Sequence, residues 1–231
     1  MRDFWTYIGN GKYNVGCDGQ TVYLFDGQGS AIAEFKGLIY AYDAAISPKD
    51  DIFVVKSNTG VLAVYSFEPP SLKMKFRFGK TAYAHNGGVC FSPDGSELYD
   101  IEDLDYGKNA LAVYDTSNFS LKYKYTPPQN HILSGMEYDE ATDAYYILGF
   151  IRSENDLRYF IGKLSGGEIR DAVSISEREH SFYDSYLSLK TSGFTKKRFG
   201  WSHLFYMGYD YDTLKNTDHT LAKLWAYYHG K

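Results

Sequence analysis

Residues 84–115 read AHNGGVCFSPDGSELYDIEDLDYGKNALAVYD, and two parts of this segment occur a second time upstream. Ser92-Pro93 repeats Ser47-Pro48 at a distance of 45 residues, and the run that begins at Leu111 repeats a run that begins 49 residues earlier, at Leu62. Both copies consist of strand-like segments separated by turns. Self-similarity at about 40–45 residues indicates a repeat whose unit is one small antiparallel sheet.

A repeat of this length, built from short strands, is typical of the blades of a β-propeller. One strand of the unit recurs along the chain and is followed each time by a short turn and a further strand. Its copies are Val22–Asp26, Leu62–Ser66, Leu111–Asp115 and Tyr159–Lys163. The sequence therefore predicts an all-β fold, a single β-propeller domain with five blades of mainly four antiparallel strands. The expected units cover residues 1–37, 38–80, 81–128, 129–178 and 179–231.

The last of these units is less regular than the others. Only three of its segments have a strand-like pattern, and they are separated by longer loops. The three segments are Ser185–Lys190, His203–Tyr209 and Leu221–Tyr228. Residues 221–226 are the one stretch that could also wind as a helix. We expect this incomplete unit to close the ring, because an open repeat array would expose an apolar face.

Three features of the third unit resemble the WD40 repeat. His85 precedes a strand, that strand leads into Phe91-Ser92-Pro93-Asp94-Gly95, and a later strand ends in Tyr114-Asp115. The second unit matches in part, but no strand ends in Trp-Asp and the Gly-His pair of the family is absent. The resemblance implies a propeller that presents its loops and central channel to partners, usually as a scaffold without catalytic activity.

Charge and composition limit the classes of partner. Hydrophobic residues make up 44% of the chain, enough for a buried core, and the net charge is −5. This charge argues against binding to nucleic acid, which usually requires a basic face, and suits a basic protein partner. The chain has no apolar run of membrane-spanning length and no signal peptide in its first residues. We therefore expect no membrane association and a location in the cytoplasm of a bacterium-like cell.

The segments that enter the first strand of each unit are the candidate binding site. They should lie near the mouth of the central channel, and they concentrate tyrosine and histidine outside the strands, where packing in a ladder does not explain aromatic residues. The candidate partner-binding residues are Tyr40, Tyr42, Asp43, Tyr83, His85, His131, Tyr183 and Asp184.

Two clusters could instead hold a metal ion. His85, His131 and His180 occupy near-equivalent positions in successive units, but no carboxylate or cysteine recurs with them at ligand spacing. The acidic run over residues 100–105 lacks the glycine and the distal glutamate of a calcium-binding EF-hand loop, so a solvated strand end is the favoured interpretation. We predict neither a metal nor a cofactor.

Two functions of different classes remain open. The favoured one is a non-enzymatic, protein-binding propeller, with neutralisation of a basic toxin by an immunity protein as its sharper version. The alternative is an enzyme that processes a small molecule or a sugar at the channel mouth. That alternative needs convergent carboxylates or a metal, and Asp43, Asp184 and the histidines are the only material for it.

Overall fold

The computed structural model describes residues 3–77, 88–105, 107–203 and 209–230. In these residues every strand precedes Ser176 and every helix follows it. The strands are β1 (Thr6–Gly9), β2 (Tyr13–Cys17), β3 (Gly19–Asp26), β4 (Ala31–Ile46), β5 (Ile52–Ser57), β6 (Val61–Ser66), β7 (Ser71–Arg77), β8 (Val89–Phe91), β9 (Glu97–Asp105), β10 (Lys108–Asp115), β11 (Ser120–Tyr125), β12 (His131–Asp139), β13 (Ala144–Arg152), β14 (Leu157–Ser165) and β15 (Glu168–Ile175). The helices are α1 (Glu177–Thr191), α2 (Lys196–His203), α3 (Tyr211–Lys215) and α4 (Leu221–His229).

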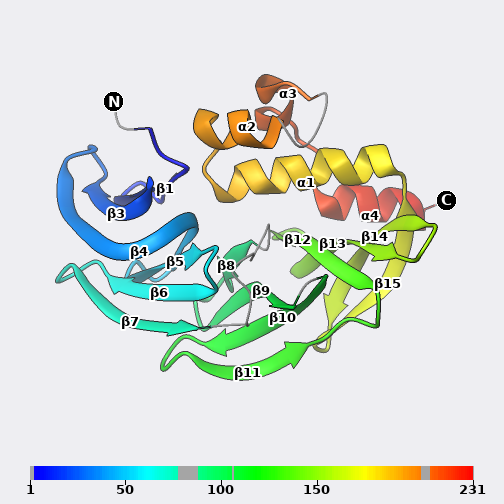
Figure 1. The fold of residues 1–231 in the computed structure, drawn as a ribbon, viewed down its shortest axis with the longest axis horizontal. Helices are drawn as coiled ribbons and strands as arrows, with labels where there is room; N and C mark the ends of the chain where they lie inside the picture. Colours follow the sequence, from blue (N-terminus) through cyan, green and yellow to red (C-terminus); the bar gives the residue numbers. More distant parts are fainter. Residues whose placement is uncertain (1–2, 78–87, 106, 204–208, 231) are drawn as a thin grey trace.

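The described strands form antiparallel sheets in which sequence neighbours are also neighbours in space. One sheet has the order β1 to β7, a second β8 to β11 and a third β12 to β15. Strand β4 belongs to two units, since Ala31–Lys36 pairs with β3 and Ala41–Ile46 pairs with β5. Figure 1 shows the sheets side by side as an arc. The predicted mostly-β chain of antiparallel sheets is therefore confirmed.

The prediction of a fifth unit of strands over residues 179–231 is wrong. The expected strand Ser185–Lys190 lies within α1, and Leu221–Tyr228 lies within α4. His203 is the last residue of α2, while residues 204–208 of the third expected strand lie outside the described residues. The all-β prediction therefore fails for the C-terminal part of the chain.

Local sequence explains why α1 is a helix. The Ser176 hydroxyl accepts a hydrogen bond from the Glu179 backbone N–H (3.2 Å), and the Glu179 carboxylate accepts one from the Ser176 N–H (2.8 Å). This reciprocal capping box satisfies two of the helix N-terminal donors. The residues that α1 buries include His180, Tyr183 and Leu187, which are spaced by three and four positions and so share one face.

Helix α1 lies across the inner side of the arc and contacts β4, β12, β13 and β14 (Figure 1). Glu137, a buried residue of β12, holds it there. Its carboxylate accepts hydrogen bonds from the Tyr186 hydroxyl (3.2 Å) and from the Lys190 ammonium group, both on α1. The same carboxylate accepts the N–H of Leu221, the first residue of α4, at 2.8 Å. One side chain therefore fixes two helices to the innermost strand of the last sheet.

The segment after α1 covers the free edge of the first strand. The Tyr7 N–H donates to the Ser192 carbonyl (3.0 Å), and the Thr195 hydroxyl donates to the Trp5 carbonyl (2.7 Å). Gly193 lies between these contacts with a φ of 68°. A Cβ added there would lie 1.9 Å from the Tyr7 carbonyl oxygen, so only glycine allows this approach.

The substitution Gly193→Ala should destabilise the protein strongly, because it combines a left-handed backbone with a steric collision. Gly29→Ala is the matched control, since Gly29 has a φ of 84° but an added Cβ would meet no atom within 4 Å. We expect a cost of about 1–2 kcal/mol for the control, from the backbone alone. Gly193→Ala should cost about 2 kcal/mol more, from overpacking, in urea unfolding. Equal losses would contradict tight packing on β1.

A buried ion pair joins the first sheet to the second. The Lys56 ammonium group on β5 lies 2.6 Å from an Asp100 carboxylate oxygen on β9 and also donates to the Ile101 carbonyl (2.6 Å). The second Asp100 oxygen accepts no hydrogen bond within the described residues, and burial raises the pKa of Asp100 to about 7. Glu102, also buried, accepts hydrogen bonds from Tyr114 and Lys124. The expectation of a solvated acidic strand end is therefore wrong for these two residues.

Asp100 should make stability fall with rising pH. Its pKa is about 7 in the folded protein, whereas an aspartate in an unfolded chain titrates near pH 4. Between these values the folded state binds more protons than the unfolded state, so the free energy of unfolding contributed by this group decreases as pH rises. We expect the free energy of unfolding of the wild type to fall relative to that of Asp100→Asn as pH rises across this interval. Urea unfolding at each pH measures it, and a difference that stays constant over the interval would contradict the raised pKa of Asp100.

Candidate functional site

Three of the predicted site residues lie together on β4. Tyr40 is 54% exposed, and its ring lies 6.3 Å from that of Tyr42. Tyr42 packs against Trp5 with ring centroids 5.0 Å apart, and the Lys197 ammonium group lies 4.8 Å from the Trp5 ring. Tyr40, Tyr42 and Trp5 thus form a partly exposed aromatic cluster between the first sheet and α2, which we call the Tyr40 cluster.

Asp43, the third predicted site residue on β4, faces inward. It is 4% exposed, and its carboxylate lies 3.4 Å from the guanidinium group of Arg198 on α2. The hollow beside this pair has a volume of about 10 Å³ and is lined on the other side by Leu187 and Thr191 of α1. Helix α1 thus lies on the inner side of the arc, where the sequence predicts the mouth of a channel.

The other predicted residues are not brought to this place. Tyr183 and Asp184 are 6% and 4% exposed on α1 rather than on a segment entering a strand, because the fifth unit is helical. The prediction that they lie on a segment entering a strand is therefore wrong. Tyr83 and His85 lie outside the described residues. His131 begins β12 and faces a different groove.

His180 is a buried residue of α1. Its Nε2 lies 2.9 Å from the Ser134 hydroxyl, and burial lowers the pKa of its imidazole to about 4. The centroid of its ring lies 4.6 Å from that of the Tyr159 ring. Within the described ranges, no three His, Cys, Asp or Glu side chains are grouped so that they could hold a metal ion.

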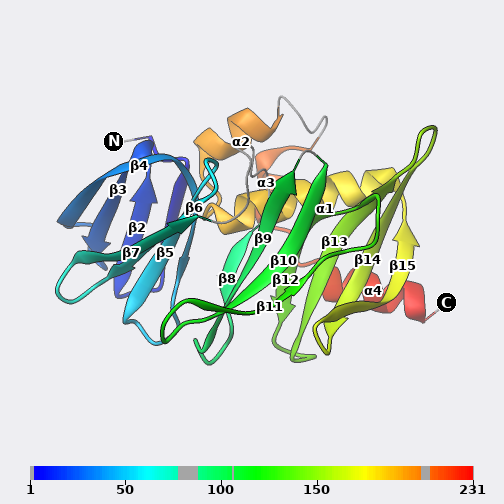
Figure 2. The same cartoon turned by 60° about the horizontal axis from the view of Figure 1, so that its bottom comes forward.

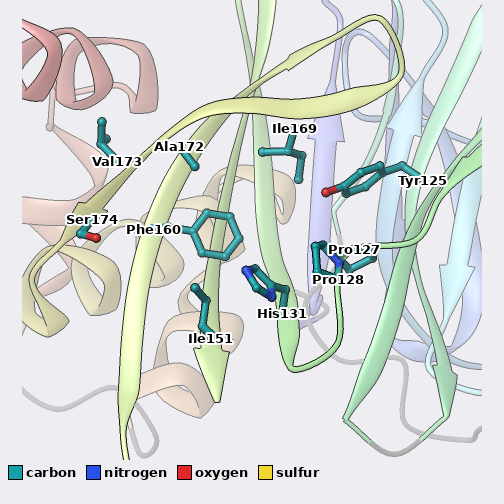
Figure 3. A pocket seen from close by; sticks show the side chains of 10 residues that line it. All are labelled: Tyr125, Pro127, Pro128, His131, Ile151, Phe160, Ile169, Ala172, Val173 and Ser174. Atoms are coloured by element: carbon teal, nitrogen blue, oxygen red, sulfur yellow. The ribbon is translucent and has the colours of Figure 1, made fainter. Parts of the chain in front are cut away.

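His131 lies in a groove of about 240 Å³ between the end of β11 and the outer strand β15 (Figure 3). Its imidazole Nδ1 lies 3.1 Å from the Gln129 carbonyl oxygen, and its ring centroid lies 5.9 Å from that of Phe160. The surrounding side chains are mainly apolar. They include Tyr125, Pro127, Pro128, Ile151, Ile169 and Val173. This groove is separate from the Tyr40 cluster.

Every second turn along the chain lies at the same end of the sheets, toward their lower edge in Figure 2. Turns of neighbouring units contact one another. The Asn10 side chain bonds to Asp50, and a Cβ on Gly95 would lie 3.2 Å from Pro48. We call this surface the hairpin face, and it comprises the turns with one flanking residue on each side. Its segments are residues 9–13, 26–31, 46–52, 66–71, 91–97, 115–120, 139–144 and 165–168.

The hairpin face is strongly acidic. Its basic residues are Lys12 and Lys49, whereas its carboxylates come from all three sheets. They are Asp26, Asp50, Asp51, Glu68, Asp94, Glu97, Asp115, Asp139, Glu140, Asp143 and Glu168. The whole chain carries only −5, so the rest of the chain is net positive. At the opposite end, in the β13–β14 turn, Glu154 and Asp156 are flanked by Arg152 and Arg158. The acidic face could be found from the sequence by counting the charged residues of every second turn, because successive turns of an antiparallel sheet lie at opposite ends.

Within the described part of the chain, none of the helices combines the length and apolar character needed to cross a membrane.

Neither a protein-family model nor a curated protein sequence matches the chain. Its structure is similar to that of hydrazine synthase from Kuenenia stuttgartiensis, with a TM-score of 0.63 over 75% of this chain and 49% of that chain, at 14% identity. It is also similar to the WD40 domain of coronin from Toxoplasma gondii, with a TM-score of 0.59 over 76% and 47% of the two chains, at 17% identity. The chain thus spans about half the length of each. At these identities the similarity shows the fold alone, and at that level it confirms the resemblance to WD40 propellers.

Proposed function

We propose that this protein is a non-enzymatic scaffold that binds a basic protein partner on its hairpin face. The observation that carries the proposal is the separation of charge: carboxylates accumulate on the turns at one end of the sheets, while the remainder of the chain is net positive. A surface of one sign attracts a partner of the opposite sign and accelerates the encounter.

The fold supports this class of function. WD40-type propellers generally serve as protein-binding scaffolds, with binding surfaces formed by turns and grooves that rigid sheets hold in place. A basic nuclease toxin is one partner of suitable charge, in which case the protein would act as an immunity protein. The Tyr40 cluster and the His131 groove are additional surfaces that such a partner could contact.

No observation favours the enzymatic alternative. It needs convergent carboxylates or a metal, with Asp43, Asp184 and the histidines as its material, and the structure buries Asp43 and Asp184 and pairs Asp43 with Arg198.

The double variant Asp51→Lys, Glu140→Lys should bind a fluorescent nona-arginine peptide about tenfold more weakly at low salt, measured by anisotropy. Both residues are exposed on the hairpin face. The matched control is Glu154→Lys, Asp156→Lys, which changes the net charge equally at the opposite end of the strands. We expect less than a twofold effect from the control. An equal loss would mean that overall charge, and not the hairpin face, attracts the peptide.

A further inference from the structure

The hairpin face contains a pocket of about 270 Å³ at the junction of the second and third sheets. Four tyrosines from four different strands line it, namely Tyr99 on β9, Tyr123 on β11, Tyr138 on β12 and Tyr145 on β13. The rings of Tyr99 and Tyr145 are stacked with centroids 4.3 Å apart, and Tyr138 is tilted against Tyr145 at 5.1 Å. The pocket therefore has aromatic walls contributed by both sheets.

Hydrogen bonds hold these rings in place. The Tyr99 hydroxyl donates to the Glu97 carboxylate (2.7 Å), and the Tyr138 hydroxyl donates to the Asp143 carboxylate (2.6 Å). The Tyr145 hydroxyl donates to the Phe91 carbonyl at 3.2 Å. Because these hydroxyl protons are already directed at protein acceptors, the pocket offers a ligand the half-buried rings of Tyr123 and Tyr138 and the carboxylate of Asp143, while Tyr99 and Tyr145 stack on each other beneath.

The charges around the pocket are mainly negative. Hydrogen bonding to Asp143, burial and the nearby carboxylates raise the pKa of Tyr138 to about 12. The neighbouring cations are already paired: Lys122 lies 2.5 Å from Glu97, and Arg170 lies 3.5 Å from Glu168. A negative pocket with aromatic walls favours a cation, since the face of a tyrosine ring attracts positive charge.

We propose that this tyrosine pocket binds an arginine side chain of the basic partner, and this inference rests on the proposed function. A guanidinium group is planar and stacks on aromatic rings, and its fork of N–H donors matches a carboxylate such as that of Asp143. An ammonium group has the charge but lacks the flat surface. The hairpin face would then attract the partner, while the pocket anchors one residue of it.

Tyr138 offers a pair of variants that separates the ring from its hydroxyl. Tyr138→Leu removes the aromatic wall, and we expect about fivefold weaker binding of the nona-arginine peptide, in the range for loss of one cation–π contact. Tyr138→Phe keeps the wall and should stay within twofold of wild type. Tyr227→Leu, at an exposed tyrosine of α4, is the control and should have no effect. Thermal melting of each variant checks that it folds.

Asp143→Asn provides a second test if Tyr138→Leu fails to fold. Asp143 has a φ of 47°, a conformation that asparagine tolerates, so this change removes the charge and keeps the turn. It should weaken nona-arginine binding by about threefold or more, and should weaken nona-lysine binding less.

The outcomes distinguish this inference from the proposed function. If the Asp51→Lys, Glu140→Lys variant loses binding and the folded Tyr138→Leu and Asp143→Asn variants do not, the pocket does not bind arginine. The proposed role of the hairpin face would still stand. Equal weakening of the arginine and lysine peptides would overturn the assignment to arginine.

Discussion

The packing of the C-terminal helices on the sheets depends on the buried carboxylate of Glu137. It lies on the innermost strand of the last sheet and receives donors from α1 and from the first residue of α4. A buried carboxylate is costly unless its oxygens are satisfied, and here the Lys190 ammonium group compensates the charge directly. The arrangement holds only if both helices dock together, so it couples the C-terminal segment to the strands as one cooperative unit.

At the opposite end of the array, backbone contacts cover the free edge of the first strand. Repeat arrays bury their apolar faces only against neighbours, so a first strand without a neighbour must be covered. Residues 192–195 cover β1 by accepting its Tyr7 N–H and bonding to the Trp5 carbonyl. Among the described residues, α1 lies on the inner side of the arc, whereas the hairpin face lies at the ends of the strands and the His131 groove lies beside the outer strand β15.

Sequence reasoning could predict the units whose signals are local. The strands near Val22, Leu62, Leu111 and Tyr159 follow from hydrophobic runs bounded by turns, and the structure has β3, β6, β10 and β14 there. The helical end could not be recognised from aromatic content, because a segment such as SFYDSYLSLK is compatible with both strand and helix spacing. The capping pair Ser176 and Glu179 was the local signal that distinguished them.

The candidate site was harder to predict because it depends on which segments meet. The acidic run that contains Asp100 and Glu102 is typical of a solvent-exposed segment, yet Asp100 is buried beside the Lys56 ammonium group, which lies 44 positions away in the chain. Likewise, Tyr99 and Tyr145 lie far apart in sequence but stack across the junction of two sheets. Tyr40 and Tyr42 were predicted on a segment outside the strands, whereas the structure places both on β4, with their rings 6.3 Å apart.

The acidity of the hairpin face has two physical origins. Part of it follows from turn formation, since aspartate accepts hydrogen bonds from the residues after it: the Asp26 carboxylate accepts the Gln28 N–H, and Asp115 accepts that of Ser117. Hydrogen bonds from Ser92 and Ser96 hold the pKa of Asp94 well below its usual value, so such carboxylates are ionised at any neutral pH.

The other part is not required by the turns. Serine or asparagine could cap the same turns without charge, and Glu140 and Glu168 are exposed residues whose type the backbone does not dictate. This charge in excess of turn chemistry is the feature on which the proposed binding of a basic partner rests. The tyrosine pocket lies among these carboxylates, so in the proposed function long-range attraction and short-range stacking would act on the same partner. Attraction sets the rate of encounter and weakens with salt, whereas a buried contact with aromatic rings sets the lifetime of the complex.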